Sequence, residues 1–98
     1  MNFEIAPKES EIEANWDDAR LYCFSLNIDG KTGWRLPTRK ELNEIYNSNN
    51  DFEIYWYWAS EEFDTVSAWT LTFTNGLRYE DYKDNYNYVR AIRDLKDN

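Results

Sequence analysis

The ten residues GWRLPTRKEL, at positions 33–42, constrain the fold of this chain more than any other stretch. Pro37 fixes its own φ angle and disfavours the helical conformation for the residue before it. Thr38 and Glu41 have the spacing of a capping box, in which each side chain accepts a hydrogen bond from the other residue's backbone amide. The segment therefore predicts extended backbone up to the proline and a helix that begins at Arg39.

The hydrophobic pattern of the remaining chain predicts a second helix and a series of strands. Asn15 is a favourable N-cap, and apolar side chains recur at helical spacing over residues 16–26. Asn75 and Gly76 form a strong two-residue hairpin signal. The other expected elements are a strand at 2–6, a loop at 7–13, a turn at 27–33, a helix at 39–46, a polar loop at 47–51, and strands at 55–60, 66–74, 77–83 and 88–95. Two helices followed by antiparallel strands predict an α+β domain in which the helices pack on the sheet.

Length and composition favour a single domain, 1–98, with a core made largely of aromatic rings. The chain has 98 residues, of which 18% are aromatic. Such rings bury a large area, but the N–H of tryptophan and the O–H of tyrosine need hydrogen-bond partners. In the run over residues 55–58 we expect one alternate pair of rings to face the core.

The net charge of −8 argues against a direct nucleic-acid or membrane partner, because both surfaces attract basic patches. A local basic cluster of Lys31, Arg35, Arg39 and Lys40 is interpreted as a solvated turn with helix-capping charges rather than as a phosphate site. No signal peptide or membrane-spanning apolar run is visible, so we expect a soluble protein that is cytoplasmic in a bacterial host or associated with a virion.

The residue types argue against catalysis and metal binding. The chain has no histidine, and its one cysteine, Cys23, leaves no intrachain disulfide. Asp84, Asn85 and Asn87 could chelate calcium only weakly, because calcium needs six to eight oxygens held together. We therefore expect no cofactor, no metal site and no enzymatic activity.

The best candidate for a binding surface is the segment over residues 78–88, where tyrosines alternate with charged and amide side chains. Tyrosine offers a large contact area at low entropy cost, and amides supply adaptable hydrogen bonds. The alternative is a solvent-facing hairpin whose rings pack across the strands. The predicted ligand-binding residues are Trp56, Arg78, Tyr79, Asp81, Tyr82, Asp84, Asn85, Tyr86, Asn87 and Tyr88.

The chain resembles the Lcl C-terminal domain family, a family of bacterial and phage proteins with a C-type-lectin-like fold. The matching segments are WDDARLYC at 16–23, GWRLPT at 33–38 with the following Glu41 and Leu42, YWAS at 57–60, Ala68 and Trp69 with Phe73 before Gly76, and VRAIR at 89–93. The resemblance implies that the ligand surface lies on the late strands and their loops. It also implies that Trp58 belongs to the core, which leaves Trp56 exposed.

One departure from the family concerns Ala91, where exported members often carry a cysteine that looks like a partner for the helix cysteine. Cys23 is therefore interpreted as a small buried apolar residue, which fits a reducing compartment rather than an extracellular adhesin.

Several large or charged side chains are expected to have structural roles. Trp34 is interpreted as a core anchor, and Arg35 as a partner for an anion, a carboxylate or backbone carbonyls. Arg90 and Arg93 should face opposite sides of a strand, with at least one buried against an acidic group. The full set is Trp16, Trp34, Arg35, Pro37, Glu41, Trp58, Trp69, Arg90 and Arg93.

Three functions agree with these features. The leading hypothesis is a non-enzymatic module that binds a protein or a saccharide through the aromatic and amide-rich segment. The alternative is a small acidic inhibitor, of the kind that a phage encodes, of a basic or nucleic-acid-binding host protein. The third is a structural or assembly protein of a virion, with a homo-oligomeric interface.

Overall fold

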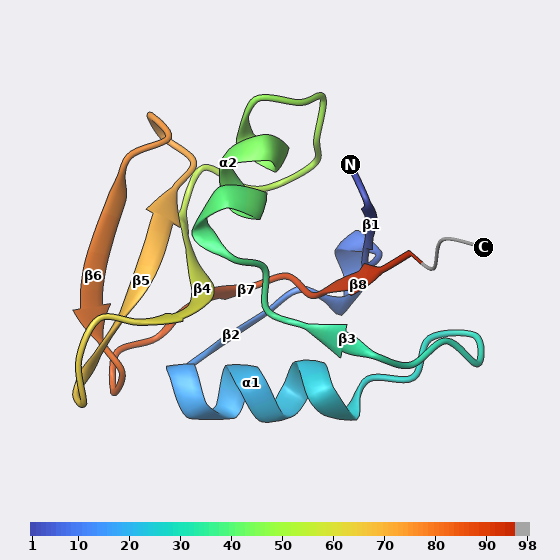
Figure 1. Ribbon diagram of the computed structural model, residues 1–98, viewed down its shortest axis with the longest axis horizontal. Coiled ribbons are helices and arrows are strands. Elements are labelled where there is room, and N and C mark those ends of the chain that lie inside the picture. The colour runs from blue at the N-terminus through green and yellow to red at the C-terminus, as the bar shows by residue number, and fades with distance from the viewer. Residues whose placement is uncertain (96–98) are drawn as a thin grey trace.

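The computed structural model describes residues 1–95, which form an α+β fold with two helices and two sheets (Figure 1). The helices are α1 (Trp16–Ser25) and α2 (Arg39–Tyr46), with a short 3-10 turn at Lys8–Ser10. The strands are β1 (Phe3–Ile5), β2 (Ile12–Ala14), β3 (Trp34–Arg35), β4 (Trp56–Glu62), β5 (Ser67–Thr72), β6 (Arg78–Tyr82), β7 (Asn87–Val89) and β8 (Ile92–Asp94). One sheet has the order β1-β8-β3 and the other β2-β7-β4-β5-β6.

Both helices begin where their capping residues predict. In α1 the side chain of Asn15 accepts from the amide of Asp18 at 2.9 Å. In α2 the capping box is complete, because Thr38 accepts from the amide of Glu41 at 3.2 Å and Glu41 accepts from the amide of Thr38 at 2.8 Å. These local hydrogen bonds satisfy amides that have no partner inside the helix.

The strands are mixed rather than wholly antiparallel. All strand pairs are antiparallel except β4 and β7, which run parallel at Tyr57 and Tyr88. The predicted loop over 7–13 also extends into a strand that the pattern missed: β2 pairs with β7, and its three residues are too few to show an alternation. In the larger sheet, β7 therefore lies between β2 and β4, although it comes after both in the sequence.

The predicted strand at 88–95 is in fact two strands, β7 and β8, which belong to different sheets. The break falls at Arg90 and Ala91. The Arg90 side chain is buried and donates to the carbonyl of Ala6 at 2.7 Å, while the amide of Ala6 donates to the carbonyl of Ala91 at 2.9 Å. These contacts divert the backbone from one sheet to the other.

The connection between β5 and β6 is a hairpin, but it is longer than the expected two-residue turn. The amide of Thr72 donates to the carbonyl of Leu77 at 2.9 Å, so the loop covers residues 73–76. Phe73 does not pair with β6. Its ring packs in the core, and its amide donates to the carbonyl of Tyr55, on the β4 side. Gly76 supplies the left-handed position, with φ of 77°.

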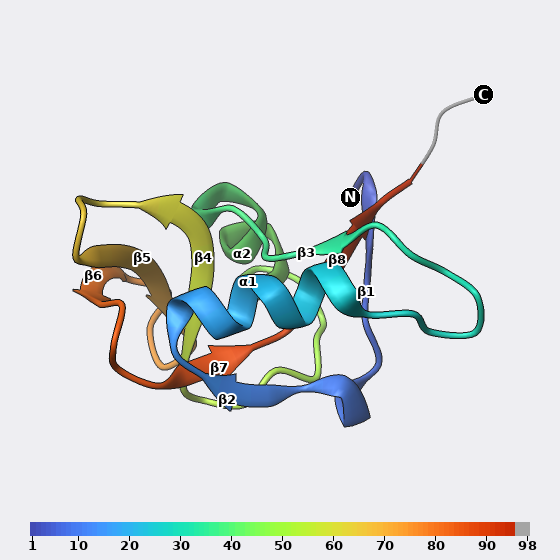
Figure 2. The same cartoon turned by 90° about the horizontal axis from the view of Figure 1, so that it is seen from below.

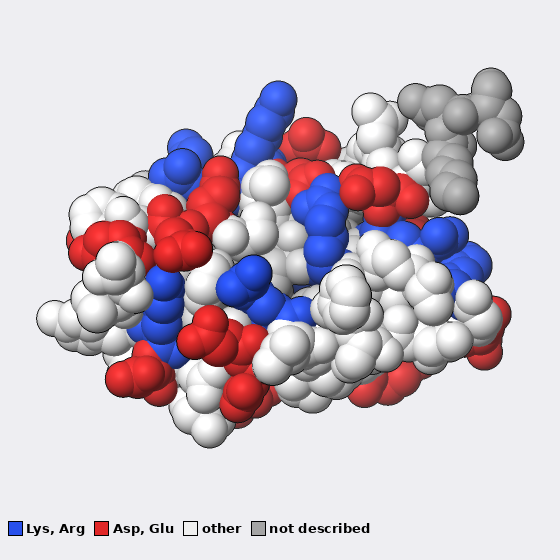
Figure 3. Space-filling view, turned by 60° about the horizontal axis from the view of Figure 1, so that its bottom comes forward, with Lys and Arg blue, Asp and Glu red and all other residues white. Residues whose placement is uncertain are grey.

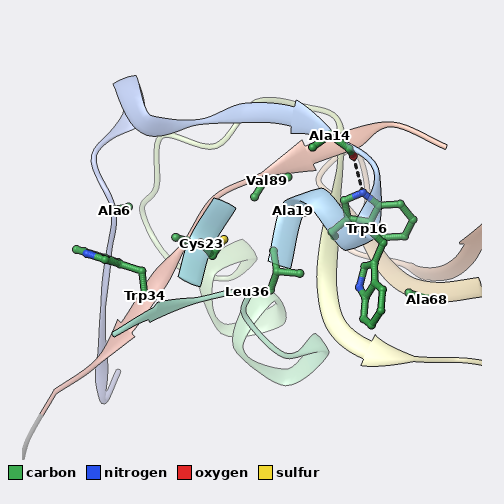
Figure 4. Packing of buried hydrophobic residues seen from close by; sticks show 11 residues of the cluster. Ala6, Ala14, Trp16, Ala19, Cys23, Trp34, Leu36, Ala68 and Val89 are labelled. Atoms are coloured by element: carbon green, nitrogen blue, oxygen red, sulfur yellow. Dashed lines mark hydrogen bonds between the residues drawn. The ribbon is translucent and has the colours of Figure 1, made fainter. Parts of the chain in front are cut away.

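The core consists of two clusters, one on each face of the five-stranded sheet. The first lies beneath α1 and contains Trp16, Cys23, Trp34, Trp58 and Val89 among others (Figures 2 and 4). The second lies beneath α2 and contains Leu42, Ile45, Tyr57, Leu71 and Phe73 among others. Because both faces are covered, the strand β5 is buried on both sides rather than on one.

The buried rings find polar partners, as the composition requires. The indole N–H of Trp16 donates to the carbonyl of Ala59, and that of Trp58 donates to the carbonyl of Ala14, both at 2.9 Å. The hydroxyl of Tyr57 donates to Glu11 at 2.8 Å. Within residues 1–95, every buried side-chain nitrogen and oxygen has a hydrogen-bond partner.

The aromatic run at 55–58 differs from the expected alternation. Tyr57 and Trp58 are both buried, on opposite faces of the sheet, whereas Tyr55 and Trp56 are both exposed. The prediction that Trp58 is buried and Trp56 exposed is confirmed. The prediction of one buried alternate pair is wrong. The first residues of this segment lie at the exposed end of the sheet, whereas the middle of β4 is covered by core side chains on both faces.

None of the helices within residues 1–95 combines the length and the apolar character needed to cross a membrane.

Candidate functional site

The exposed aromatic side chains gather at the end of the larger sheet where β4 and β7 begin. Because these two strands are parallel, their first residues lie at the same end of the sheet. A groove of about 350 Å³ opens there. We call it the aromatic groove, and its lining residues are Glu13, Ile54, Tyr55, Trp56, Thr74, Tyr86, Asn87 and Tyr88.

Two pairs of stacked rings border the aromatic groove. Tyr55 stacks on Tyr88 with centroids 4.7 Å apart and an interplanar angle of 23°. Trp56 stacks on Tyr79 with centroids 5.1 Å apart and an angle of 11°. Each pair joins residues that are distant in the sequence, so the tertiary fold positions the rings. Tyr86 has no ring partner among the described residues and is 64% exposed.

The Trp56–Tyr79 stack also has a structural consequence. Trp56 lies opposite Thr72, and Tyr79 lies opposite Thr70, on strands that flank β5. Strands separated by one neighbour are about 10 Å apart, so the two rings must lean toward each other over β5 to reach their separation of 5.1 Å. They cover Thr70 and Thr72, which are fully buried. Trp56 nevertheless keeps 37% of its surface exposed to the groove.

The electrostatic environment of the aromatic groove is acidic. Glu13 lines it, and none of its eight lining residues is basic. The pKa of Tyr88 is raised, first by desolvation and then by the negative charge of Glu13, with smaller effects from Glu11 and Glu53. An anionic ligand would meet repulsion here.

Four of the predicted ligand-binding residues line the aromatic groove, and a fifth borders it. Trp56, Tyr86, Asn87 and Tyr88 belong to the lining, and Tyr79 adjoins it through its stack on Trp56.

A second group of predicted residues lies elsewhere and is engaged in holding the turn between β6 and β7. The carboxylate of Asp81 accepts from the amide group of Asn85 at 2.8 Å, from that of Asn87 at 2.9 Å and from the backbone amide of Tyr82 at 2.9 Å. Asp81 and Tyr82 line a separate hollow at the end of β6, beside the connection between β4 and β5. Arg78 and Asp84 are exposed outside the groove. The segment 78–88 is therefore divided between two surfaces.

Sequence reasoning missed four lining residues: Glu13, Ile54, Tyr55 and Thr74. Tyr55 and Ile54 adjoin the aromatic run that contains Trp56, so their proximity was the available signal. For Glu13 the sequence offered no signal, because its position depends on the pairing of β2 with β7, in which it lies opposite Tyr88.

The tryptophans and the proline that were predicted to be structural are buried or half-buried. Trp16, Trp34, Pro37 and Trp58 are buried. Trp69 is half-buried, with the guanidinium of Arg39 at 4.4 Å from its ring centroid.

The three arginines pair with carboxylates, which is one of the partners expected for Arg35 and the partner expected for at least one of Arg90 and Arg93. Arg35 makes a bidentate pair with Glu41, with both distances 2.8 Å, and also binds Asp94. Arg90 is buried against Glu11 and Asp51, whereas Arg93 pairs with Glu4 at 2.7 Å near the surface. The strand argument for Arg90 was wrong, since this residue lies between two strands rather than in one.

The local basic cluster is largely neutralised by carboxylates. Lys31 pairs with Glu4 at 3.2 Å, and Arg39 pairs with Glu61 at 3.0 Å. Together with the double pairing of Arg35, these contacts support the interpretation of a solvated, capping cluster. Figure 3 shows acidic and basic side chains interspersed over this face, with no uniformly basic surface.

A larger and more apolar groove, of about 660 Å³, lies beside α1. Leu21 and Phe24 line it from the outer face of the helix, and Trp34 and Leu36 line it from the opposite wall. Phe24 is 84% exposed. The groove lacks amide side chains and contains none of the predicted binding residues.

The one cysteine of the chain is shielded from solvent. Cys23 is fully buried, and burial raises the pKa of its thiol to about 12. A thiol in that state is a poor nucleophile. Within residues 1–95, no group of three or more Cys, Asp or Glu side chains is placed to hold a metal ion.

Comparison with known protein families assigns the chain. The model of the Lcl C-terminal domain matches residues 4–93, so the chain belongs to this family. The resemblance noted in the sequence is thus confirmed over nearly the whole chain. A search of curated proteins found no match.

Proposed function

We propose that this protein is a non-enzymatic binding module that recognises a protein or a saccharide at the aromatic groove, on a C-type-lectin-like variant of the α+β fold. The observation that carries the proposal is the convergence of Tyr55, Trp56, Tyr86 and Tyr88 around one concave surface. Tyrosine and tryptophan give large contact areas at low entropy cost and combine apolar faces with a polar group.

The support beneath the rings favours recognition by a preformed surface. The strands β4 and β7 begin at the groove and continue into a part of the sheet that is covered on both faces. The stacks fix the orientation of Tyr55 and Trp56. A binding surface whose side chains are held in place loses less entropy when a ligand binds.

The proposal is tested by alanine substitutions in the rings that stand most exposed. Tyr55→Ala with Tyr86→Ala removes two groove rings, and neither is buried. Tyr82→Ala is the matched control, because Tyr82 is 65% exposed but lies outside the groove. The three proteins are compared on a glycan array and on a displayed peptide library.

We expect the double variant to lose about tenfold or more in affinity for each ligand that the native protein selects, as for the truncation of contact residues in a binding surface. The Tyr82 control should keep native affinity. Equal binding by the double variant and the native protein would show that the groove is not the recognition site.

A second candidate function, an acidic inhibitor of a basic partner that acts in the cytoplasm of a bacterial host, is favoured by the charge distribution. Lys31, Arg35 and Arg39 are tied to carboxylates of this chain, whereas Asp64, Glu80 and Asp84 form no ion pair within residues 1–95. Affinity for such a partner should fall steeply with ionic strength. A complex that is insensitive to salt would eliminate this candidate.

A further inference from the structure

We propose that the aromatic groove selects a cationic group, the ammonium or guanidinium of a basic peptide, over a neutral ligand of the same shape. This inference rests on the proposed function and names the ligand chemistry of the same site. It follows from the ring faces, the charge of the lining and the hydrogen-bonding groups that remain available.

The rings of the groove present electron-rich faces. A cation is attracted to the face of Trp or Tyr when it lies within about 6 Å of the ring centroid. Tyr55 and Trp56 each use one face for a stack, and both side chains remain exposed. Tyr86 uses neither face for a ring partner among the described residues.

Three of the other tryptophans have a cation of this chain against the ring: Trp16 and Trp34, which are buried, and Trp69, which is half-buried. Trp16 carries Arg20 and Lys83, each at 4.7 Å from its centroid. Trp69 carries Arg39, and Trp34 carries Arg93 at 5.9 Å. Trp58 is enclosed in the core. Trp56 is the one exposed tryptophan within residues 1–95 whose ring has no cation from this chain upon it.

One of the three carboxylates around the groove adds a negative charge that no cation within residues 1–95 neutralises. Glu11 pairs with Arg90, and Glu53 pairs with Lys8. Glu13, by contrast, forms no ion pair within residues 1–95, and it lines the groove directly. A bound cation would complete that missing pair. The net charge of −8 would also attract such a ligand at long range.

The polar groups of the groove suit a saccharide less well. Asn87 is the single amide side chain in the lining, but it is buried and its NH₂ group donates to Asp81 at 2.9 Å. It is therefore committed within the protein. Sugar hydroxyls would be left with Thr74, the tyrosine hydroxyls and Glu13.

The experiment uses two pairs of probes whose members differ in charge but hardly in shape. Choline is compared with 3,3-dimethylbutan-1-ol, and a short lysine peptide is compared with the same peptide acetylated on the lysine amine. Binding is followed by NMR chemical shifts of Tyr55, Trp56 and Tyr86 in the full chain. Glu13→Gln removes the groove charge, and Glu9→Gln, at an exposed carboxylate outside the groove, is the matched control.

We expect choline and the lysine peptide to bind with dissociation constants on the order of 1–10 mM, and their neutral twins at least about tenfold more weakly. Glu13→Gln should weaken the cationic probes by about threefold or more, and Glu9→Gln should leave them unchanged.

Three results would overturn the inference. In the first, each cationic probe and its neutral analogue bind equally, which would show a binding groove without selectivity for cations. Binding that Glu13→Gln does not weaken would remove the role assigned to its charge. In the third, neither cationic probe changes the NMR chemical shifts, but the Tyr55→Ala, Tyr86→Ala double variant loses binding to saccharides on the glycan array. That result would show a saccharide site and keep the proposed function. If that double variant also bound every array ligand natively, both proposals would fail.

Discussion

The buried guanidinium of Arg90 gives the sharpest test of how this fold is held together. Its side chain is 3% exposed and donates to the carbonyl of Ala6 at 2.7 Å, to Glu11 at 3.3 Å and to Asp51 at 2.7 Å. The Glu11 side chain is itself only 7% exposed. Replacing Arg90 with Met keeps much of the volume but removes the nearer of the two cations that pair with the buried Glu11 carboxylate, which leaves only Lys8 at 3.7 Å.

The expected cost of Arg90→Met follows from that geometry. At 3.3 Å and an effective dielectric constant of about 20, the attraction between Arg90 and Glu11 is roughly 5 kcal/mol. The desolvation of both ions opposes this attraction, but removing one partner typically costs about 3–5 kcal/mol because the other remains buried. A domain of this size has a total free energy of unfolding of about 5–15 kcal/mol. The substitution should therefore remove a large share of the stability.

The measurement is urea unfolding followed by tryptophan fluorescence, with the slope m checked for constancy. Arg93→Met is the control, because its pair with Glu4 lies nearer the surface and should contribute about 1 kcal/mol or less. In a double-mutant cycle, Glu11→Gln should reduce the cost of Arg90→Met by about 1–3 kcal/mol. The reasoning is refuted if Arg90→Met costs no more than Arg93→Met, or if the two effects simply add.

Two further outcomes are expected. The hydrogen bonds and charge of Arg35 hold the pKa of Glu41 below its ordinary value of 4.5. Because this pKa is lower in the folded state than in the unfolded state, Glu41 stabilises the protein above about pH 4.5. The stabilisation is lost as the pH falls through the pKa of the folded state. Glu41→Gln should therefore flatten the acid limb of urea-unfolding stability between neutral pH and about pH 3, and a curve parallel to that of the native protein would contradict the assignment. Gly76→Ala should lower the midpoint of thermal unfolding more than Gly30→Ala does, because both glycines have positive φ but only at Gly76 would a Cβ come within 2.6 Å of the Tyr46 ring. Equal shifts for the two alanine variants would show that the ring yields without cost.

The sequence alone determined the features whose partners lie a few residues apart. The N-cap of α1, the capping box of Thr38 and Glu41, and the presence of a hairpin around Gly76 were all predictable, because the residues that interact are at most five positions apart. The exposure of Trp56 followed from the family resemblance, and the burial of at least one of Arg90 and Arg93 against an acidic group followed from the chemistry of a buried charge. Three of the eight lining residues of the aromatic groove, Tyr86, Asn87 and Tyr88, were predictable from the composition of residues 78–88.

Only the tertiary structure decided how the late strands are shared between two sheets and which side chains meet at their ends. Arg90 diverts the backbone by binding the carbonyl of Ala6, a residue 84 positions away. Glu13 reaches the groove only because β2 pairs with β7, and Tyr55 stacks on Tyr88 across parallel strands. Such contacts depend on which strands pair and in which register, and that choice is made by burying both faces of the sheet at once. The local pattern of side chains in the sequence therefore does not predict which strands pair.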